Sequence, residues 1–300
     1  MVSPAKHGSE MSDGSPGTAS LRSGDAAAAN TSVEIVKPAH VEAKSFYNRE
    51  FTGDRYTPFD KAESHSAYPS LKAFIDRYDL SNKRVLEVGC GRGAFQDLVE
   101  DYTGVDFAST VAKKLHKPFF EASATALPFE RDSFDATWTI WVLEHVPDPE
   151  RAFVELRRVL KPGGLLYLAP AWNCRAWFAD GYPVRSYSEF GLKGKLIKAS
   201  LLVRERLVWR LLWALPRRAL RAAGLFFNRQ PTRFRYRTLK PNYETFWMSD
   251  SDATNSMDPY EALMWFVSRG DECLNCTGRL RQLLFRGGPL IFRIHKDNES

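Results

Sequence analysis

The sequence predicts an α/β fold with a mostly parallel sheet and helices on both faces. Three observations predict it. Residues 84–170 alternate short β-rich runs with longer helical runs, and this alternation is typical of parallel sheets. A glycine-rich turn directly follows the first apolar run. The chain has 300 residues, 44% of them hydrophobic, which is enough to fill one sizeable buried core.

Five short β-rich runs account for the parallel part of the sheet. They are predicted at residues 84–88, 102–105, 118–121, 136–140 and 165–169. Residues 70–78 have the spacing of a helix that leads into the first strand, and residues 149–160 place their apolar side chains on one helical face. The Pro-Gly-Gly turn within residues 161–164 is typical of a helix stop.

A further helix and two more strands complete a predicted seven-stranded sheet. The helix is expected at residues 259–269, where Gly270 ends it. The two strands are expected at residues 272–276 and 289–294. Because the chain departs from the strand-helix rhythm after Pro170, we predict a basic helical insertion after the fifth strand.

The chain therefore divides into four predicted parts. Residues 1–32 are rich in Ser, Gly, Ala and Asp and bury too little apolar surface to fold, so we predict a disordered tail. Residues 33–170 form the core that binds a cofactor, and residues 258–300 complete it. Residues 171–257 form the insertion, at the sheet edge where open α/β folds bind ligands, so we expect a substrate lid.

The cysteine content and the start of the sequence indicate the cellular compartment. The chain has four cysteines and a start without the apolar core of a signal peptide, so we expect free thiols in a reducing, cytoplasmic setting. No stretch approaches the roughly 20 apolar residues that span a bilayer. Any membrane contact is therefore expected to be peripheral, at the inner face of a membrane.

The segment Val-Leu-Glu-Val-Gly-Cys-Gly-Arg-Gly carries the clearest chemical signal. It places Gly89, Gly91 and Gly93 directly after an apolar strand, and Asp106 ends the next strand. Glycines allow a tight turn and close approach of the backbone to a ligand, while an acid in that position accepts both hydroxyl protons of a ribose. Alone, the pattern indicates a nucleotide-like cofactor or a plain strand-to-helix turn.

Six ordered motifs over about residues 84–173 resemble the class I S-adenosylmethionine-dependent methyltransferases. They are the glycine segment, Gly-Val-Asp, Ala-Leu-Pro-Phe, Ser-Phe-Asp, Leu-Glu-His-Val-Pro-Asp-Pro and Leu-Lys-Pro-Gly-Gly. The fifth motif is similar to small-molecule methyltransferases of the type 11 kind, including those that O-methylate ubiquinone precursors. Gly93 follows Gly91 too closely for a dehydrogenase fingerprint. The resemblance implies a Rossmann-like fold and S-adenosyl-L-methionine as cofactor.

The resemblance also implies a set of cofactor-binding residues. Those expected to line the methionine and ribose portions are Glu87, Gly89, Cys90, Gly91 and Gly93. Asp106 would bind the ribose hydroxyls, and Phe107 would lie beside the adenine. Ser123 and Ala124 would contact the adenine side, although Ser123 stands where the family usually has an acid. Ile140 would contact the cofactor through its backbone. No metal is expected.

His145 is the candidate catalytic residue. Methyl transfer depends chiefly on positioning, and a base is needed only for an unactivated acceptor such as a hydroxyl. His145 follows the fourth strand at the ligand edge and titrates near neutral pH. The alternative is that it packs the loop with Glu144 and Asp148.

Two further segments invite a functional interpretation. The run at residues 247–252 could place acids at the acceptor pocket, and a polar turn explains it equally well. Cys273 and Cys276 have the spacing of half a zinc site, but no second pair accompanies them, so we expect buried core cysteines.

The insertion carries most of the positive charge. Fifteen Lys or Arg stand against two Glu between Arg185 and Lys240, a local net charge of +13 in a chain of net charge +6. If residues 193–217 are helical, Leu196, Leu201 and their apolar neighbours share one side and the cations the other, with Trp209 and Trp213 among the cations. An ordinary lid helix, an anionic membrane surface bound through residues 193–240 and nucleic acid all remain open.

The leading functional class is a methyltransferase for a small-molecule or lipid-linked acceptor. An RNA or protein methyltransferase and a non-catalytic binding module with the same fold are the alternatives. Residues 140–143 read Ile-Trp-Val-Leu and lack the Asn/Asp-Pro-Pro-aromatic motif of enzymes that methylate nucleic-acid bases. The missing motif disfavours a nucleic-acid partner without excluding one, and the motifs specify neither the acceptor atom nor an oligomeric state.

Overall fold

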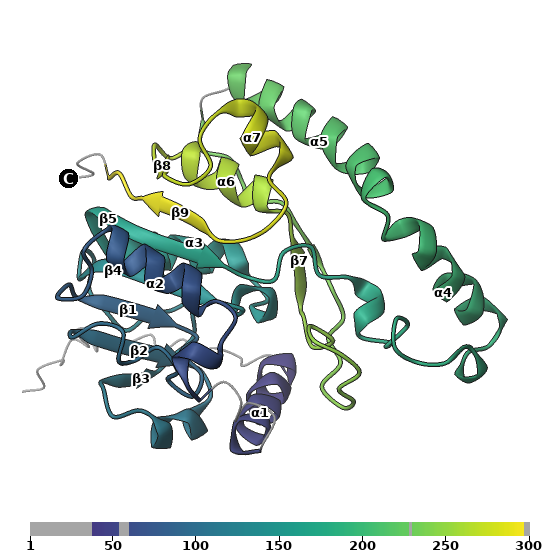
Figure 1. Cartoon of the computed structure of the whole chain (residues 1–300), viewed down its shortest axis with the longest axis horizontal. Helices are drawn as coiled ribbons and strands as arrows, with labels where there is room; N and C mark the ends of the chain where they lie inside the picture. The colour runs from purple at the N-terminus through teal and green to yellow at the C-terminus, as the bar shows by residue number, and fades with distance from the viewer. Residues whose placement is uncertain (1–37, 54–59, 228–229, 297–300) are drawn as a thin grey trace, which may run out of the picture. The chain divides into compact units, whose positions relative to one another are not determined.

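A seven-stranded sheet organises the part of the chain that the computed structural model describes, residues 38–53, 60–227 and 230–296 (Figure 1). The predicted tail at residues 1–32 lies outside the described residues. The sheet has the order β3-β2-β1-β4-β5-β9-β8. Its strands are β1 (Val85–Val88), β2 (Tyr102–Asp106), β3 (Phe119–Glu121), β4 (Phe134–Ile140), β5 (Leu160–Ala169), β8 (Glu272–Cys273) and β9 (Leu290–Arg293).

The strand directions match the predicted α/β class. Strands β1 to β5 pair in parallel, and β9 is antiparallel to both β5 and β8. The predicted mostly parallel, seven-stranded sheet is therefore confirmed. Each of the five parallel strands overlaps its predicted run to within a few residues, apart from β5, which begins earlier than expected.

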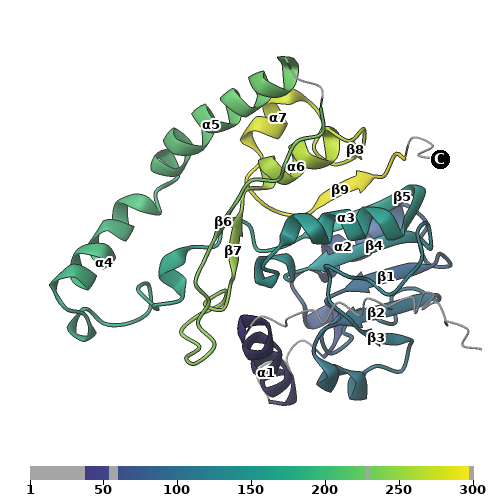
Figure 2. The same cartoon turned by 180° about the vertical axis from the view of Figure 1, so that it is seen from behind.

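Helices cover both faces of the sheet, as predicted (Figure 2). On one face, α2 (Tyr68–Arg77) buries Leu71, Phe74 and Ile75 in a cluster with the sheet residue Trp138. On the other face lie α3 (Pro149–Val159) and α6 (Pro259–Val267). This arrangement follows from the sequence, because alternate side chains of a strand point to opposite faces.

Two boundaries near the sheet differ from the sequence-based expectation. The turn at residues 161–164 was expected only to stop the preceding helix, but β5 already begins at Leu160. The reason is long-range pairing, since Gly163 N donates to Ile294 O at 2.8 Å and Ile294 N donates to Gly164 O at 2.9 Å. Strand β8 is shorter than predicted and ends at Cys273.

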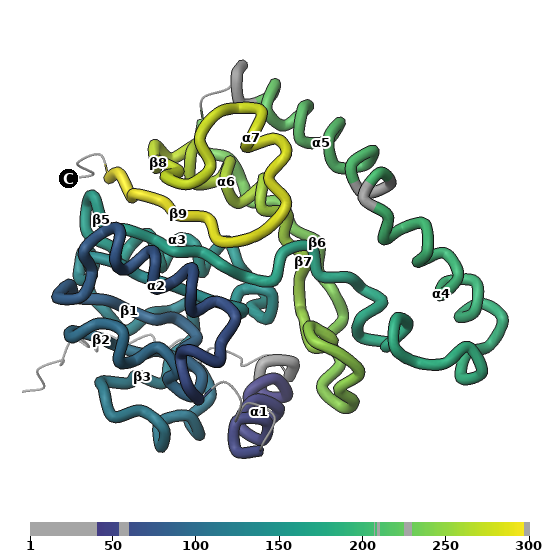
Figure 3. Tube along the Cα trace, viewed as in Figure 1, coloured from purple at the N-terminus to yellow at the C-terminus, as the bar shows by residue number. Residues whose placement is uncertain are grey.

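The insertion contains the two longer helices α4 and α5 and a β-ribbon, whose course Figure 3 shows. The single helix expected over residues 193–217 is instead divided into α4 (Leu192–Arg204) and α5 (Leu207–Phe227), with the break at Glu205 and Arg206. Strands β6 (Tyr236–Thr238) and β7 (Asn255–Met257) pair antiparallel. A short helix, α7 (Arg279–Leu284), follows β8 in the chain.

Helix α5 turns Arg218 toward the core. Arg218 is 5% exposed, and its guanidinium contacts both carboxylate oxygens of Asp258, at 2.5 and 3.2 Å. It also donates to the carbonyls of Leu283 and Phe285, each at 2.7 Å. Arg218 is one of the fifteen cations counted in the insertion, and in the structure it holds α5 against the core.

Candidate active site

The carboxyl ends of β1, β2 and β4 meet where the strand order reverses. Strand β1 pairs with β2 on one side and with β4 on the other. Open α/β sheets bind ligands in the crevice at such a point. The residues expected to bind the cofactor at residues 87–93, at Asp106 and at Ile140 all belong to these strand ends or to the turn after β1.

The glycine turn approaches the end of β4 closely. Gly89 and Gly91 have φ angles of 79° and 48°, which residues with a side chain rarely adopt. A Cβ on Gly89 would lie 2.0 Å from a Cγ atom of Val142, so no larger residue fits there. The amides of Gly89 and Cys90 both donate to Val105 O, at 2.7 and 3.0 Å. The turn therefore requires glycine for both its conformation and its packing.

Asp106 is held at the end of β2 by the backbone. Its Oδ2 accepts from Gly91 N at 3.0 Å and its Oδ1 accepts from Ala108 N at 2.9 Å. Asp106 is buried, with an exposed fraction of 6%. Burial raises the pKa of Asp106 to about 6, and the backbone donors oppose that rise. A carboxylate offers about four lone-pair positions, so it can accept further hydrogen bonds from a ligand.

Glu87 lies beneath this turn in β1. The residue is 3% exposed, and its Oε2 accepts from the Tyr102 hydroxyl at 2.5 Å. Burial raises the pKa of Glu87 to about 8, which favours the neutral acid at pH 7. The thiol of Cys90 is also buried, and burial raises its pKa. The thiol therefore offers little thiolate as a nucleophile.

The remaining predicted cofactor residues lie along the same edge. Phe107 packs edge-on against Tyr47 at 5.4 Å between ring centroids. Ser123 follows β3, and its hydroxyl accepts from Thr125 N at 3.2 Å, in a turn that also buries Ala124. Ile140 ends β4 and is 7% exposed.

Sequence analysis missed the part that α1 (Pro38–Thr52) plays at this edge. The Phe51 ring lies 3.5 Å from the position of a Cβ on Gly91. Tyr47 also contacts His145, with 5.7 Å between ring centroids, and its hydroxyl donates to Asp252. No local pattern signals these contacts, because α1 precedes the glycine turn by dozens of residues and meets it only in the folded chain.

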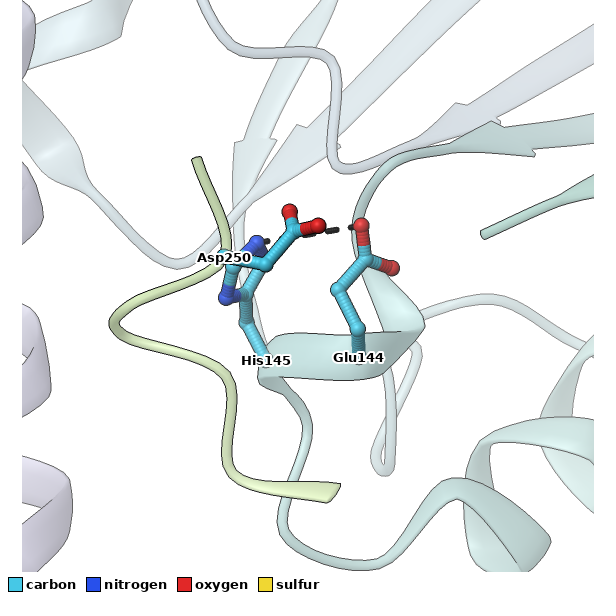
Figure 4. Close-up of side chains that lie close together, drawn as sticks. All are labelled: Glu144, His145 and Asp250. Atoms are coloured by element: carbon cyan, nitrogen blue, oxygen red, sulfur yellow. Dashed lines mark ion pairs between the residues drawn. The ribbon is translucent and has the colours of Figure 1, made fainter. Parts of the chain in front are cut away.

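His145 lies among carboxylates from two distant segments (Figure 4). It ends a short 3₁₀ helix, η4 (Leu143–His145), directly after β4. Its Nδ1 is 3.3 Å from Asp252 Oδ2, and its Nε2 is 3.8 Å from Glu144 Oε1. Glu144, His145 and Asp250 offer ligand atoms that all lie within 4.8 Å of one another.

Hydrogen bonds at β7 attach the insertion to η4 and place its acids Asp250 and Asp252 beside His145. Thr254 N donates to Glu144 O at 2.9 Å, and the Asn255 side chain donates to Leu143 O and Val146 O at 2.7 and 2.8 Å. These bonds attach the insertion to η4. The run at residues 247–252, which sequence analysis left between an acidic site and a polar turn, thus contributes two acids beside His145. Asp148, the other proposed neighbour of His145, caps α3 instead.

Burial and the neighbouring charges shift the pKa of His145 in opposite directions. Burial alone would lower the pKa of His145, but the charges of Asp252, Glu144 and Asp250 raise it above 6.5 overall. Burial raises the pKa of Glu144 to about 7. Neither carboxylate oxygen of Glu144 accepts a hydrogen bond of ordinary geometry from the described residues. Perturbed titration of this kind is typical of functional sites.

One imidazole and two carboxylates also form a donor set that a divalent cation accepts. Among the described residues this is the one group of three or more such side chains with that spacing. Cys273 and Cys276 belong to no such group. Both are buried free thiols, as predicted, and burial raises the pKa of each.

Comparison with known proteins identifies the core segment. Residues 86–168 match the family described as a methyltransferase domain. The resemblance predicted from the six motifs is therefore confirmed, and this segment carries a methyltransferase domain. The match covers β2, β3 and β4 and nearly all of β1 and β5, together with η4 and His145.

Individual relatives match the same region. The chain is 33% identical to phthiotriol/phenolphthiotriol dimycocerosates methyltransferase 1 of Mycobacterium ulcerans over 138 residues, 40% of this chain and 51% of that protein. It is 36% identical to the ubiquinone biosynthesis O-methyltransferase of Xanthomonas oryzae over 130 residues, 38% of this chain and 54% of that protein. The chain thus spans about half the length of these relatives.

The residues present fit S-adenosylmethionine, the cofactor of class I methyltransferases. The crevice combines a glycine turn that admits no side chain at Gly89 with a buried acid, Asp106, that keeps acceptor capacity. Both features lie at the strand ends where such a nucleotide-like group binds.

Proposed function

We propose that this protein transfers a methyl group from S-adenosylmethionine to a small-molecule or lipid-linked acceptor. The observation that carries the proposal is the juxtaposition of the glycine turn and Asp106 with His145 and its carboxylates. The methyltransferase domain at residues 86–168 and the acceptors named for the relatives support the same class.

S-adenosylmethionine, when bound, supplies an electrophilic methyl group. Asp106 accepts hydrogen bonds from the ribose hydroxyls, while the turn at Gly89 and Gly91 brings the backbone against the cofactor. Tyr47 and Phe51 of α1 cover the edge and restrict water. The chain thereby contributes positioning and desolvation, which account for most of the catalysis in such a displacement.

His145 acts as the base for a hydroxyl acceptor in this proposal. Asp252 Oδ2 lies 3.3 Å from Nδ1 without forming a hydrogen bond, and its negative charge favours a proton on Nδ1, so that Nε2 is the nitrogen that takes the proton. The Tyr47 hydroxyl donates to Asp252 and so orients the carboxylate. A carboxylate close to Nδ1 favours this tautomer of the ring, as in other acid-base sites.

The proposal predicts that the protein labels an acceptor from a cell extract. The purified chain is incubated with deuteromethyl-labelled S-adenosylmethionine and extract, and the products are followed by mass spectrometry. We expect a compound whose mass increases by the labelled methyl group, together with S-adenosylhomocysteine. The same incubation with the Asp106→Ala variant is the control. A wild-type chain that binds the cofactor but labels nothing in any extract would favour the non-catalytic binding module.

We further propose that α4 and α5 hold the protein at anionic membrane surfaces. A lid packed on the core would bury the apolar side of these helices, yet many of their apolar side chains are at least half exposed. The exposed side chains are Leu192, Leu196, Leu202, Val203, Val208, Leu212, Trp213 and Leu220. Leu201 is the apolar side chain of these two helices that is buried, among those the structure describes.

Charge complementarity supports an anionic membrane as the partner. Lys193, Lys195 and Arg206 are exposed on or between these helices, and Glu205 is the one acid there. The side chains of Trp209 and Arg210, both expected on the cationic side, lie outside those the structure describes. Apolar side chains flanked by cations are typical of an interfacial helix. None of the described helices is both long and apolar enough to cross a bilayer.

Replacing Leu212 and Leu220 with Ser is expected to weaken vesicle binding by at least about ten-fold, because each apolar side chain that enters the interface contributes on the order of 1 kcal/mol or more. Co-sedimentation with anionic and neutral vesicles at low salt measures the effect. Binding of the wild type is expected to be restricted to anionic vesicles and to fall with salt as screening increases.

The double variant Val154→Ser/Val267→Ser is the matched control. Both valines are exposed, on α3 and α6, so their loss should leave vesicle binding unchanged. A wild-type protein that stays in solution with anionic vesicles at low salt would return α4 and α5 to the lid interpretation.

A further inference from the structure

A second cavity region lies away from the candidate active site, on the inner side of α5. The larger cavity has a volume of about 730 Å³ and is bordered by α5, the β6–β7 ribbon and the start of α6. Six arginines line it: Arg175, Arg217, Arg218, Arg221, Arg235 and Arg237. Its two acids are Asp258 and Glu261. Asp106 and His145 are not part of its lining.

A smaller cavity of about 210 Å³ adjoins the first and shares Arg175, Arg217 and Arg218 with it. It adds Arg204 and Arg286, so that eight arginines line the two cavities together. Its wall is also apolar in part, formed by Trp177, Leu211, Trp213 and Ala214. The pair of cavities therefore joins a cationic chamber to a partly apolar one.

The two acids of the lining form ion pairs with arginines of α5. Asp258 pairs with Arg218. Glu261 lies 3.1 Å from Arg221. These pairs attach α5 to α6, and Glu261 also interacts electrostatically with Arg235 of the lining.

Four arginines of the lining form no ion pair with a described carboxylate. The described residues supply no carboxylate within 4.0 Å of Arg217, Arg235, Arg237 or Arg286. Each of these four is exposed. Like charges in one concavity repel one another and raise the local concentration of anions. The lining therefore favours a ligand with more than one negative charge.

The arginines favour a phosphate as that ligand, because a phosphate carries more than one negative charge. The planar fork of a guanidinium group donates two parallel hydrogen bonds to phosphate oxygens, and several such forks can surround one group. The apolar wall with Trp177 and Trp213 lies directly beside the chamber, and α5 continues to the exposed side chains Leu212 and Leu220. A hydrocarbon attached to the phosphate would find apolar surface along this path.

We propose that the arginine-lined cavities bind a phosphate or diphosphate group. The proposal does not depend on methyl transfer. Strand β7 connects the two regions, since Asn255 bonds to η4 beside His145 while Ser256 lines the larger cavity. Its ligand is a phosphorylated lipid or a free diphosphate, and the two sources share the same recognition chemistry.

Titration calorimetry on the full chain at low salt tests the proposal with inorganic diphosphate, geranyl diphosphate and geraniol. We expect both diphosphates to bind and geraniol not to bind. Geranyl diphosphate that binds about ten-fold or more tightly than inorganic diphosphate would assign the site to a lipid. Equal affinities would assign it to free diphosphate.

The variant Arg235→Gln/Arg237→Gln is expected to bind either diphosphate at least about ten-fold more weakly, because charge-assisted hydrogen bonds are lost. The matched control, Arg77→Gln/Arg131→Gln, removes two exposed arginines outside the cavities and should bind like the wild type. Equal weakening in both variants, or no binding by the wild type, would overturn the proposal. S-adenosylmethionine binding is measured in parallel, so that failure of this site is distinguishable from failure of the proposed activity.

Discussion

Replacing His145 with Ala is expected to lower turnover by about 10²- to 10⁴-fold while leaving affinity for S-adenosylmethionine nearly unchanged. The expectation follows from a general base that touches the acceptor and not the cofactor. Turnover is measured as formation of S-adenosylhomocysteine, with the acceptor found by deuteromethyl labelling and with both substrates saturating. Unchanged turnover, where methyl transfer limits the rate, would leave His145 with a structural part only.

The pH dependence of turnover gives a second measure of the same residue. A base must be neutral to accept a proton, so turnover is expected to rise with pH through an apparent pKa above 6.5, because Asp252, Glu144 and Asp250 raise the pKa of His145. Asp252→Asn removes one of those charges and should move the profile to lower pH. The observed value belongs to the coupled cluster, since Glu144 titrates in the same range.

A chelator distinguishes the base from a metal ligand at the same cluster. Glu144, His145 and Asp250 have the spacing of a cation site, and a metal would make turnover depend on added divalent ions. The general base predicts equal turnover with and without chelator. Loss of turnover on chelation, restored by a divalent cation, would replace the base with a metal centre.

Local patterns carried enough information to predict the sheet and its cofactor edge. The apolar runs that became β1 and β4, and the glycines after β1, depend on interactions between near neighbours in sequence and on the period of a strand. Asp106 could be assigned in the same way, because it ends β2 at a fixed distance from the glycine turn. These residues therefore stood out before the structure was known.

Contacts between distant segments could not be predicted in this way. Tyr47 and Asp252 lie 205 residues apart, yet both belong to the cluster around His145. The sequence also could not predict which side of α5 faces the core. Arg218 is one of the fifteen cations of the insertion, and its burial depends on Asp258 and on two carbonyls beyond the end of α6. A side chain's neighbours in the chain do not reveal which distant acid will pair with it.

Replacing Asp106 with Ala is expected to weaken binding of S-adenosylmethionine by about 2 to 3 kcal/mol, roughly 30- to 150-fold, because two charge-assisted hydrogen bonds to the ribose are lost. Calorimetry with the cofactor and with S-adenosylhomocysteine measures the change. Asp106 also accepts from Gly91 N and Ala108 N, so the melting temperature of the variant is compared with that of the wild type.

Two controls separate ribose binding from a general loss of charge or fold. Asp101 lies just before the opposite end of β2 and is exposed, so Asp101→Ala should leave affinity unchanged. Because burial raises the pKa of Asp106 to about 6, a falling pH protonates the carboxylate, and affinity of the wild type should weaken as the pH drops through that value. Asp106→Ala should lose this pH dependence. A folded variant that binds the cofactor as tightly as the wild type would remove Asp106 from the site and leave the glycine turn as a structural feature alone.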